Sequence, residues 1–298
     1  MISPGINVVT DLTLLGAPVT LEAGEQCFAN KIGEFRVMFE RLKSLRSNHV
    51  SFYLLRHCFG IPKLTYLLRS CPSWLFDHHL NTIDSEIKSC LESIMNNQTN
   101  DSQWLLASLP IKLGGLGIRR STDIGLSAFL SSANSVSSLL GSMLNFDHDA
   151  VASIPFYRDG LERWNIINGG NVPQSLCSQD AWDSINSVRL WNSINIVGDF
   201  ERARRLAMTR PESNLWLYAL PSRSIGTLLD NNHFRIIVGL RLGCRLCIQH
   251  RCTCGDMVLE NGLHGLSCLK SAGRHSRHRE LNNIIWRALN SVHFPSQF

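Results

Sequence analysis

Residues 27–46 read CFANKIGEFRVMFERLKSLR, and the spacing of their apolar side chains indicates the fold class. Phe28, Ile32, Phe35, Phe39 and Leu42 follow one another at intervals of four, three, four and three residues. These intervals place the five side chains on one stripe of an α-helix. Such a stripe usually faces a protein core, so the segment predicts an amphipathic helix that ends near Arg46.

The residues after this helix predict further helices. HVSFYLLRHCFG and LTYLLRSC predict two short helices separated by Gly60-Ile61-Pro62, and a longer helical segment is expected from Trp74 to Met95. Thr122 or Asp123 could cap a further helix, and others are expected over about 178–195 and 199–208. Only the opening MISPGINVVTDLTLLGAPVT, rich in β-branched residues, suggests one or two short strands. The predicted fold is mainly α.

Three glycines, Gly114, Gly115 and Gly117, lie close together after Pro110. Glycine clusters can surround phosphates, but no GK[ST] follows and no dinucleotide fingerprint fits. We therefore attribute these glycines to the backbone geometry of a turn.

Composition restricts the classes of protein. The chain has 298 residues, 44% of them hydrophobic, which is enough for a globular core. It has neither a secretory leader pattern nor an apolar run near 18 residues, so the sequence predicts an intracellular protein of the cytoplasm or nucleus with no membrane association. Its cysteines predict a reducing compartment.

Charge is unevenly distributed along the chain. Residues 1–200 carry 15 Lys and Arg against 18 Asp and Glu, whereas residues 201–298 carry 14 against 6, a net charge of +8. All but one of those 14 cations are arginines, and the guanidinium group matches phosphate geometry. The segment predicts a nucleic-acid-binding surface, and a solvated face that maintains solubility is the alternative. The candidate contact residues are Arg241, Arg245, Arg251, Arg274, Arg277 and Arg279.

The same segment contains a cluster of cysteine and histidine. Cys252-x-Cys254 and His264-x3-Cys268 are two closely spaced pairs of the ligand types that zinc prefers, and glycines beside them allow tight turns. Only one residue separates Cys252 from Cys254, a closer spacing than is usual for two zinc ligands, so Cys247 could replace Cys252. The sequence predicts a structural zinc site, and a reduced cysteine-rich turn without metal is the alternative.

Four stretches together carry a resemblance to a known family. They are DLTLLGAPV, LLRHCFGIPKLTYLLRSCP, WLLASLPIKLGGLGIRRSTDIGLSAFLSSA and RLGCRLCIQHRCTCGDMVLENGLHGLSCLKSAGRHSRHRELNNII. In combination they resemble the downstream part of a non-LTR retrotransposon polyprotein, where a reverse-transcriptase palm precedes a helical thumb and a cysteine-histidine knuckle. Leu15-Gly16 would match the turn of the primer-grip hairpin. Residues 140–210 resemble the family least.

The resemblance implies a domain plan and partners. Residues 1–21 would be a palm remnant, 22–200 a helical thumb and connection, and 201–298 a basic knuckle region that binds RNA, DNA or an RNA–DNA hybrid. The aspartates of the family's polymerase motif and the motifs of its endonuclease do not occur in this sequence. We therefore expect no catalytic residue and no activity from this chain alone, and the missing polymerase and nuclease domains are potential partners. The competing hypothesis is a helical adaptor or structural protein with a zinc-stapled C-terminus.

Overall fold

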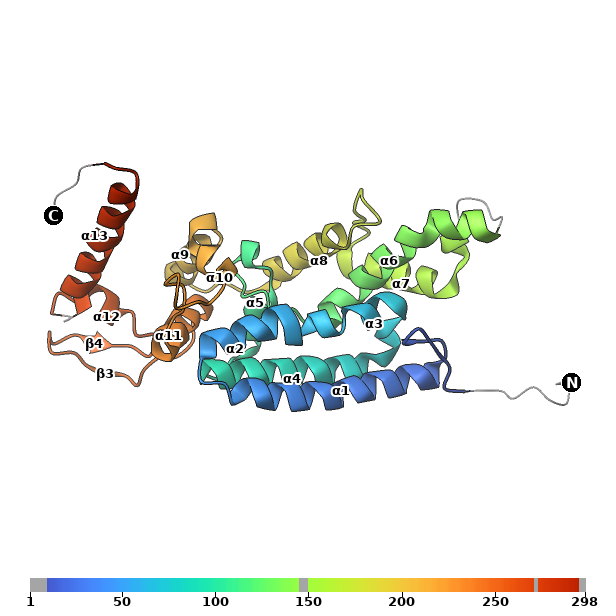
Figure 1. Ribbon diagram of the computed structural model, residues 1–298, viewed down its shortest axis with the longest axis horizontal. Coiled ribbons are helices and arrows are strands. Elements are labelled where there is room, and N and C mark those ends of the chain that lie inside the picture. Colours follow the sequence, from blue (N-terminus) through green and yellow to red (C-terminus); the bar gives the residue numbers. More distant parts are fainter. Residues whose placement is uncertain (1–9, 145–149, 271–272, 295–298) are drawn as a thin grey trace, which may run out of the picture. The chain divides into compact units, whose positions relative to one another are not determined.

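A computed structural model describes residues 10–144, 150–270 and 273–294 (Figure 1). The chain forms two compact units, Met1–Leu242 and Gly243–Phe298, here called the helical unit and the C-terminal unit. The division lies downstream of the boundary expected at residue 200. Residues 201–242, including Arg241, therefore belong to the helical unit.

The fold is mainly helical, as predicted. The helical unit contains β1 Thr13–Leu14, β2 Ala17–Pro18, α1 Leu21–Lys43, α2 Asn48–Leu54, α3 Thr65–Ser70, α4 Asp77–Met95, α5 Asp101–Ser108, α6 Ser121–Leu144, α7 Pro155–Asn168, α8 Gln179–Ser193, α9 Asp199–Met208, α10 Leu215–Tyr218 and α11 Asn231–Leu242. The C-terminal unit contains β3 His250–Arg251, β4 Met257–Val258, α12 His264–Ser267 and α13 Gly273–Ser291. Among the described residues, no helix combines the length and apolarity needed to cross a membrane.

Helix α1 carries the predicted apolar stripe, and all five of its members are buried. Thr20 caps the helix by accepting a hydrogen bond from the backbone N–H of Ala23. The helix ends at Lys43, slightly before the predicted Arg46, because Ser47 caps the next helix. Figure 1 shows α1 running beside α4, which covers the stripe.

The N-terminal residues form the expected strand pair. Thr13 pairs with Pro18 and Leu14 with Ala17, which leaves Leu15 and Gly16 as a two-residue turn. Both have positive φ, 51° and 80°. A two-residue hairpin turn with positive φ at both positions matches the twist of the strands that it joins. The hydroxyl of Tyr66 in α3 donates to the carbonyl of Leu15 at 2.8 Å and so ties this turn to the helices.

The predicted break at Gly60-Ile61-Pro62 is also present. A π-helical segment, Leu55–Phe59, follows α2 directly, and the Gly60 N–H donates to the carbonyl of Leu55 at 2.8 Å. A 3₁₀ turn, Ile61–Lys63, then leads into α3.

The start of α6 differs from the prediction. The helix begins at Ser121, so Thr122 and Asp123 lie within its first turn. The buried Asp84 of α4 accepts the backbone N–H groups of Ser121 and Thr122 at 2.6 and 3.2 Å, and also both of their hydroxyls. Burial raises the pKa of Asp84, and the hydrogen bonds from Thr122 and Ser121 oppose this shift. A side chain from another helix thus takes the role expected of a local cap.

The glycine cluster forms a compact backbone turn. Leu116 and Ile118 each donate to the carbonyl of Ala107, and Gly117 donates to that of Leu109. A Cβ on Gly115 would lie 2.0 Å from the carbonyl oxygen of Leu109, so a larger residue cannot fit. Close backbone approach explains this glycine, as expected.

Candidate metal centre

A short hairpin presents the first two candidate ligands. His250 pairs with Val258 and Arg251 with Met257, so the turn between β3 and β4 contains Cys252 and Cys254. The turn is closed by the Cys252 N–H donating to the carbonyl of Asp256 at 2.9 Å, and Gly255 adopts φ 103° within it. Only glycine enters this conformation readily, so the tight spacing of the two cysteines depends on Gly255.

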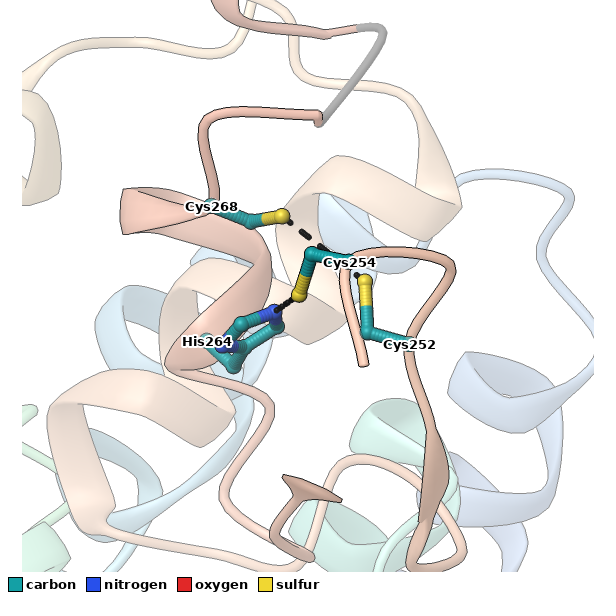
Figure 2. A group of neighbouring side chains, drawn as sticks. All are labelled: Cys252, Cys254, His264 and Cys268. Atoms are coloured by element: carbon teal, nitrogen blue, oxygen red, sulfur yellow. Dashed lines mark hydrogen bonds between the residues drawn. The ribbon is translucent and has the colours of Figure 1, made fainter. Parts of the chain in front are cut away.

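Helix α12 and the residue that follows it present the other two candidate ligands. His264 is the first residue of α12, and the N–H of Cys268 donates to the carbonyl of His264 at 2.8 Å. Residues four apart on a helix share one face. The histidine and the cysteine therefore point to the same side, toward the hairpin turn (Figure 2).

The four side chains converge to a spacing that suits a tetrahedral ion. The Cys252 and Cys268 Sγ atoms are 3.7 Å apart, the Cys254 Sγ and His264 Nε2 atoms are 3.2 Å apart, and all four ligand atoms lie within 4.8 Å of one another. Two thiolates on one zinc would be about 3.8 Å apart, and a thiolate and an imidazole nitrogen about 3.5 Å. The sulfur–sulfur distance is too long for a disulfide. These four residues can hold a metal ion.

The thiols of this group influence each other's ionisation. A backbone hydrogen bond from Cys254 is the main cause that lowers the pKa of Cys252 to about 6. At Cys254 a backbone hydrogen bond from Asp256 favours the thiolate, but desolvation and the sulfurs of Cys252 and Cys268 outweigh it and raise the pKa to about 11. Protein groups alone therefore favour one thiolate and oppose a second beside it. A divalent cation would stabilise the thiolates together.

Cys247 does not belong to the group. Its Sγ donates to the carbonyls of Leu259 and Glu260 at 3.3 and 3.8 Å, and its N–H also donates to Glu260. The possibility that it replaces Cys252 is wrong for this structure, because the hairpin turn places Cys252 beside Cys268. The sequence also did not indicate Asp256, whose carboxylate accepts from the Cys254 thiol at 3.5 Å.

Arg241 is a second correction. It is buried in the helical unit, where Nε and Nη2 donate to the carbonyl of Gly115 at 3.2 and 3.1 Å, and Nη2 also donates to Asn214 Oδ1 at 2.6 Å. Burial lowers its pKa to about 10, so it stays charged at neutral pH. A guanidinium whose donors are used internally cannot contact a phosphate, and Arg241 is a structural residue.

Other arginines of residues 201–242 also form contacts within the helical unit. Arg205 is buried, donates to the carbonyls of Trp191 and Ile194, and stacks on the Trp191 ring at 4.2 Å. Arg204 bonds to Glu201 and to the carbonyl of Arg241. The net charge of +8 over residues 201–298 therefore overstates the cationic surface.

The remaining candidates lie in the C-terminal unit. Arg245 is exposed and pairs with Glu260 at 2.9 Å, and Arg251 and Arg279 are exposed. Arg274 and Arg277 lie in α13, but their side chains are outside the described residues. Arg251 directly precedes the candidate ligand Cys252, so this arginine and the candidate metal centre share one hairpin.

The helical unit has another group of ligand types, formed by Glu25, His78 and His79. Glu25 Oε2 lies 2.7 Å from His79 Nε2 and 3.4 Å from His78 Nε2. Hydrogen bonds between α1 and α4 account for this arrangement, so we do not assign a metal to it.

Comparison of the chain with known protein families, curated proteins and solved structures gives no match.

Proposed function

We propose that the C-terminal unit binds nucleic acid from a scaffold held by a structural zinc ion. The observation that carries the proposal is the convergence of Cys252, Cys254, His264 and Cys268 inside a cationic unit. Residues 243–298 contain seven Lys and Arg against three Asp and Glu. This unit is too small to bury a large core, and a metal would supply the folding free energy that such a module lacks.

Zinc is the metal that the donor set supports best. Three thiolates and one imidazole are typical of structural zinc sites, which are closed by four protein ligands. With all four positions taken by side chains, no coordination site is left for a water or substrate. The proposed role of the metal is therefore to hold the β3–β4 turn against α12, and it takes no part in chemistry.

The proposed contacts are with the phosphate backbone. Arg251 and Arg279 are exposed, and arginine forks pair well with phosphate oxygens. Such contacts position a protein on a duplex or hybrid without recognising its sequence. The unit would therefore bind RNA, DNA and RNA–DNA hybrids with similar affinity and with strong dependence on salt.

We further propose that the chain is the thumb and knuckle part of a non-LTR retrotransposon reverse transcriptase. The strand pair with its Leu15-Gly16 turn supports this proposal, because the resemblance implies a hairpin at that place. The helices that follow the hairpin fit the implied thumb. In this role the chain binds the template and primer, and we assign it no catalytic residue.

One feature favours an adaptor role as a second candidate. Helix α13 exposes Leu281, Ile284 and Ile285, each more than half accessible. An apolar helix face of this kind can receive a partner protein. This candidate requires no affinity for nucleic acid.

The two candidates are separated by a salt titration of binding to an RNA–DNA hybrid. Nucleic-acid binding predicts that log Kd rises with log salt, and that replacement of Arg251, Arg274, Arg277 and Arg279 by alanine reduces this slope by up to about 0.9 for each lost phosphate contact. A control variant, Arg36→Ala/Arg69→Ala/Arg158→Ala/Arg202→Ala, removes four exposed arginines of the helical unit. Equal slopes for the parent and the first variant would favour the adaptor role.

A further inference from the structure

An arginine-lined pocket of about 590 Å³ lies in the helical unit, away from every residue considered so far as a ligand. Three segments form its wall: the link between α1 and α2 and, far from it in sequence, the loop before α11 and the first turns of α11 that follow this loop directly. Arg46, Arg223 and Arg235 each come from a different one of these segments. Their convergence is produced by the tertiary fold.

Asn231 fixes two of these segments together. Its Nδ2 donates to the carbonyl of Arg46 at 3.0 Å, and its Oδ1 accepts the N–H of Asn48 at 2.8 Å. A few residues away, the N–H of Leu229 donates to His49 Nδ1 at 3.1 Å. Specific hydrogen bonds therefore hold the backbone on both sides of the pocket, from which its arginines extend.

The loop that supplies Arg223 is also ordered by its own bonds. The N–H of Thr227 donates to the carbonyl of Ser222 at 3.0 Å, and the N–H of Ser222 donates to Thr227 Oγ1 at 3.1 Å. Gly226 donates to the carbonyl of Arg223 at 3.2 Å with φ 73°. Arg223 thus stands at the start of a closed turn.

The charges of the pocket are unbalanced. Among the described residues, no carboxylate forms an ion pair with Arg46, Arg223 or Arg235. The Nε of Arg235 is buried and has no hydrogen-bond acceptor. Asp230 is the one acidic residue of the lining that is described. Its carboxylate already accepts the N–H groups of Asn232 and His233 and contacts the His233 ring.

We propose that this pocket binds a phosphate group. Three guanidinium groups offer many donors, Ser47 and Asn232 line the same pocket, and a buried donor without an acceptor is costly until an anionic oxygen reaches it. The phosphate can come from a nucleic-acid backbone or from free phosphate, since both present the same oxygens. The proposal is independent of the metal centre and of binding by the C-terminal unit.

The test uses the full chain and three probes. Arg46→Ala/Arg223→Ala removes two exposed arginines of the pocket, and Arg69→Ala/Arg158→Ala removes two exposed arginines of the same unit outside it. Affinity is measured by calorimetry for inorganic phosphate, for a short single-stranded DNA, and for the same DNA with uncharged methylphosphonate linkages. Circular dichroism checks that both variants keep the helical content of the parent.

We expect the pocket variant to bind at least one phosphate probe about tenfold more weakly than the parent, because it has lost charge-assisted hydrogen bonds. The affinity of the control variant should stay within about twofold of the parent's. Loss with inorganic phosphate would show that the free anion suffices. Loss confined to charged DNA, with none for the methylphosphonate strand, would assign the backbone as the source. Similar affinities of the pocket and control variants for every probe, or no binding of phosphate or DNA by the parent, would overturn the proposal.

Discussion

The Sγ atoms of Cys252 and Cys268 lie 3.7 Å apart, although the residues are 16 positions apart in the chain. One belongs to the turn of the β3–β4 hairpin and the other follows α12, so their proximity brings the hairpin and α12 together. The separation is that of two thiolates on one tetrahedral zinc, about 3.8 Å. This relationship leads to the first two predictions.

Protein prepared under reducing conditions is expected to contain about one zinc per chain, since the four ligands complete one tetrahedral site. Cys268→Ser removes a ligand and should lower the zinc content, measured by plasma mass spectrometry after dialysis. Cys247→Ser is the matched control, because Cys247 lies in the same unit but donates to backbone carbonyls. Equal zinc content in both variants would contradict the assigned ligand set.

Chelation is expected to loosen the C-terminal unit selectively. Its fold depends on the ligands converging, whereas the helical unit has a large apolar core that includes Phe28, Phe35 and Phe39. Hydrogen exchange should therefore rise across 250–268 after a zinc chelator is added, while α1 and α4 keep their protection. Unchanged hydrogen exchange across 250–268 after chelation, with removal of the metal verified, would show that the metal does not hold the unit.

Asp84→Ala is expected to destabilise the helical unit by about 1–3 kcal/mol, because it leaves the buried N–H group of Ser121 without an acceptor and removes the acceptor of the Thr122 N–H. Chemical denaturation followed by circular dichroism measures the free energy of unfolding. Asp11→Ala, at an exposed position, should change it by less than about 0.5 kcal/mol. A similar small effect for both variants would mean that Asp84 does not hold the start of α6.

Arg241→Lys is expected to cost about 1–3 kcal/mol of stability, since one ammonium group cannot replace the fork that reaches both Gly115 and Asn214. The exposed Arg202→Lys serves as the control. Thermal unfolding reports the stability, and binding to an RNA–DNA hybrid is measured well below the transition. Weaker binding by folded Arg241→Lys with unchanged stability would return this arginine to the contact surface.

Local patterns in the sequence predicted much of the fold. The stripe from Phe28 to Leu42, the break at Gly60-Ile61-Pro62 and the helices beginning near residues 178 and 199 each depend on spacing or turn chemistry within a few residues. Spacing likewise predicted the pairs Cys252-x-Cys254 and His264-x3-Cys268 as candidate ligands. It could not decide between Cys247 and Cys252, because that choice depends on which residue the hairpin turn places beside α12.

Long-range contacts account for the rest. Asp84 lies 37 residues before the helix that it caps, and Arg241 lies 126 residues after the carbonyl to which it donates. Either residue could equally be a surface charge when judged by its neighbours in sequence. No local motif connects Arg46 with Arg223 and Arg235, which the fold brings to one pocket. Burial of a charged side chain is decided by tertiary packing, and a single sequence does not display it.

The central claim, that a metal-held C-terminal unit binds nucleic acid, is tested most directly by one comparison of affinities. The dissociation constant for an RNA–DNA hybrid is measured by fluorescence anisotropy at low salt for the parent, His264→Ala and Cys247→Ser, with zinc content determined on the same samples. We predict that His264→Ala loses zinc and binds about tenfold or more weakly, while Cys247→Ser retains both zinc and affinity. Parental affinity in zinc-free His264→Ala would contradict the claim.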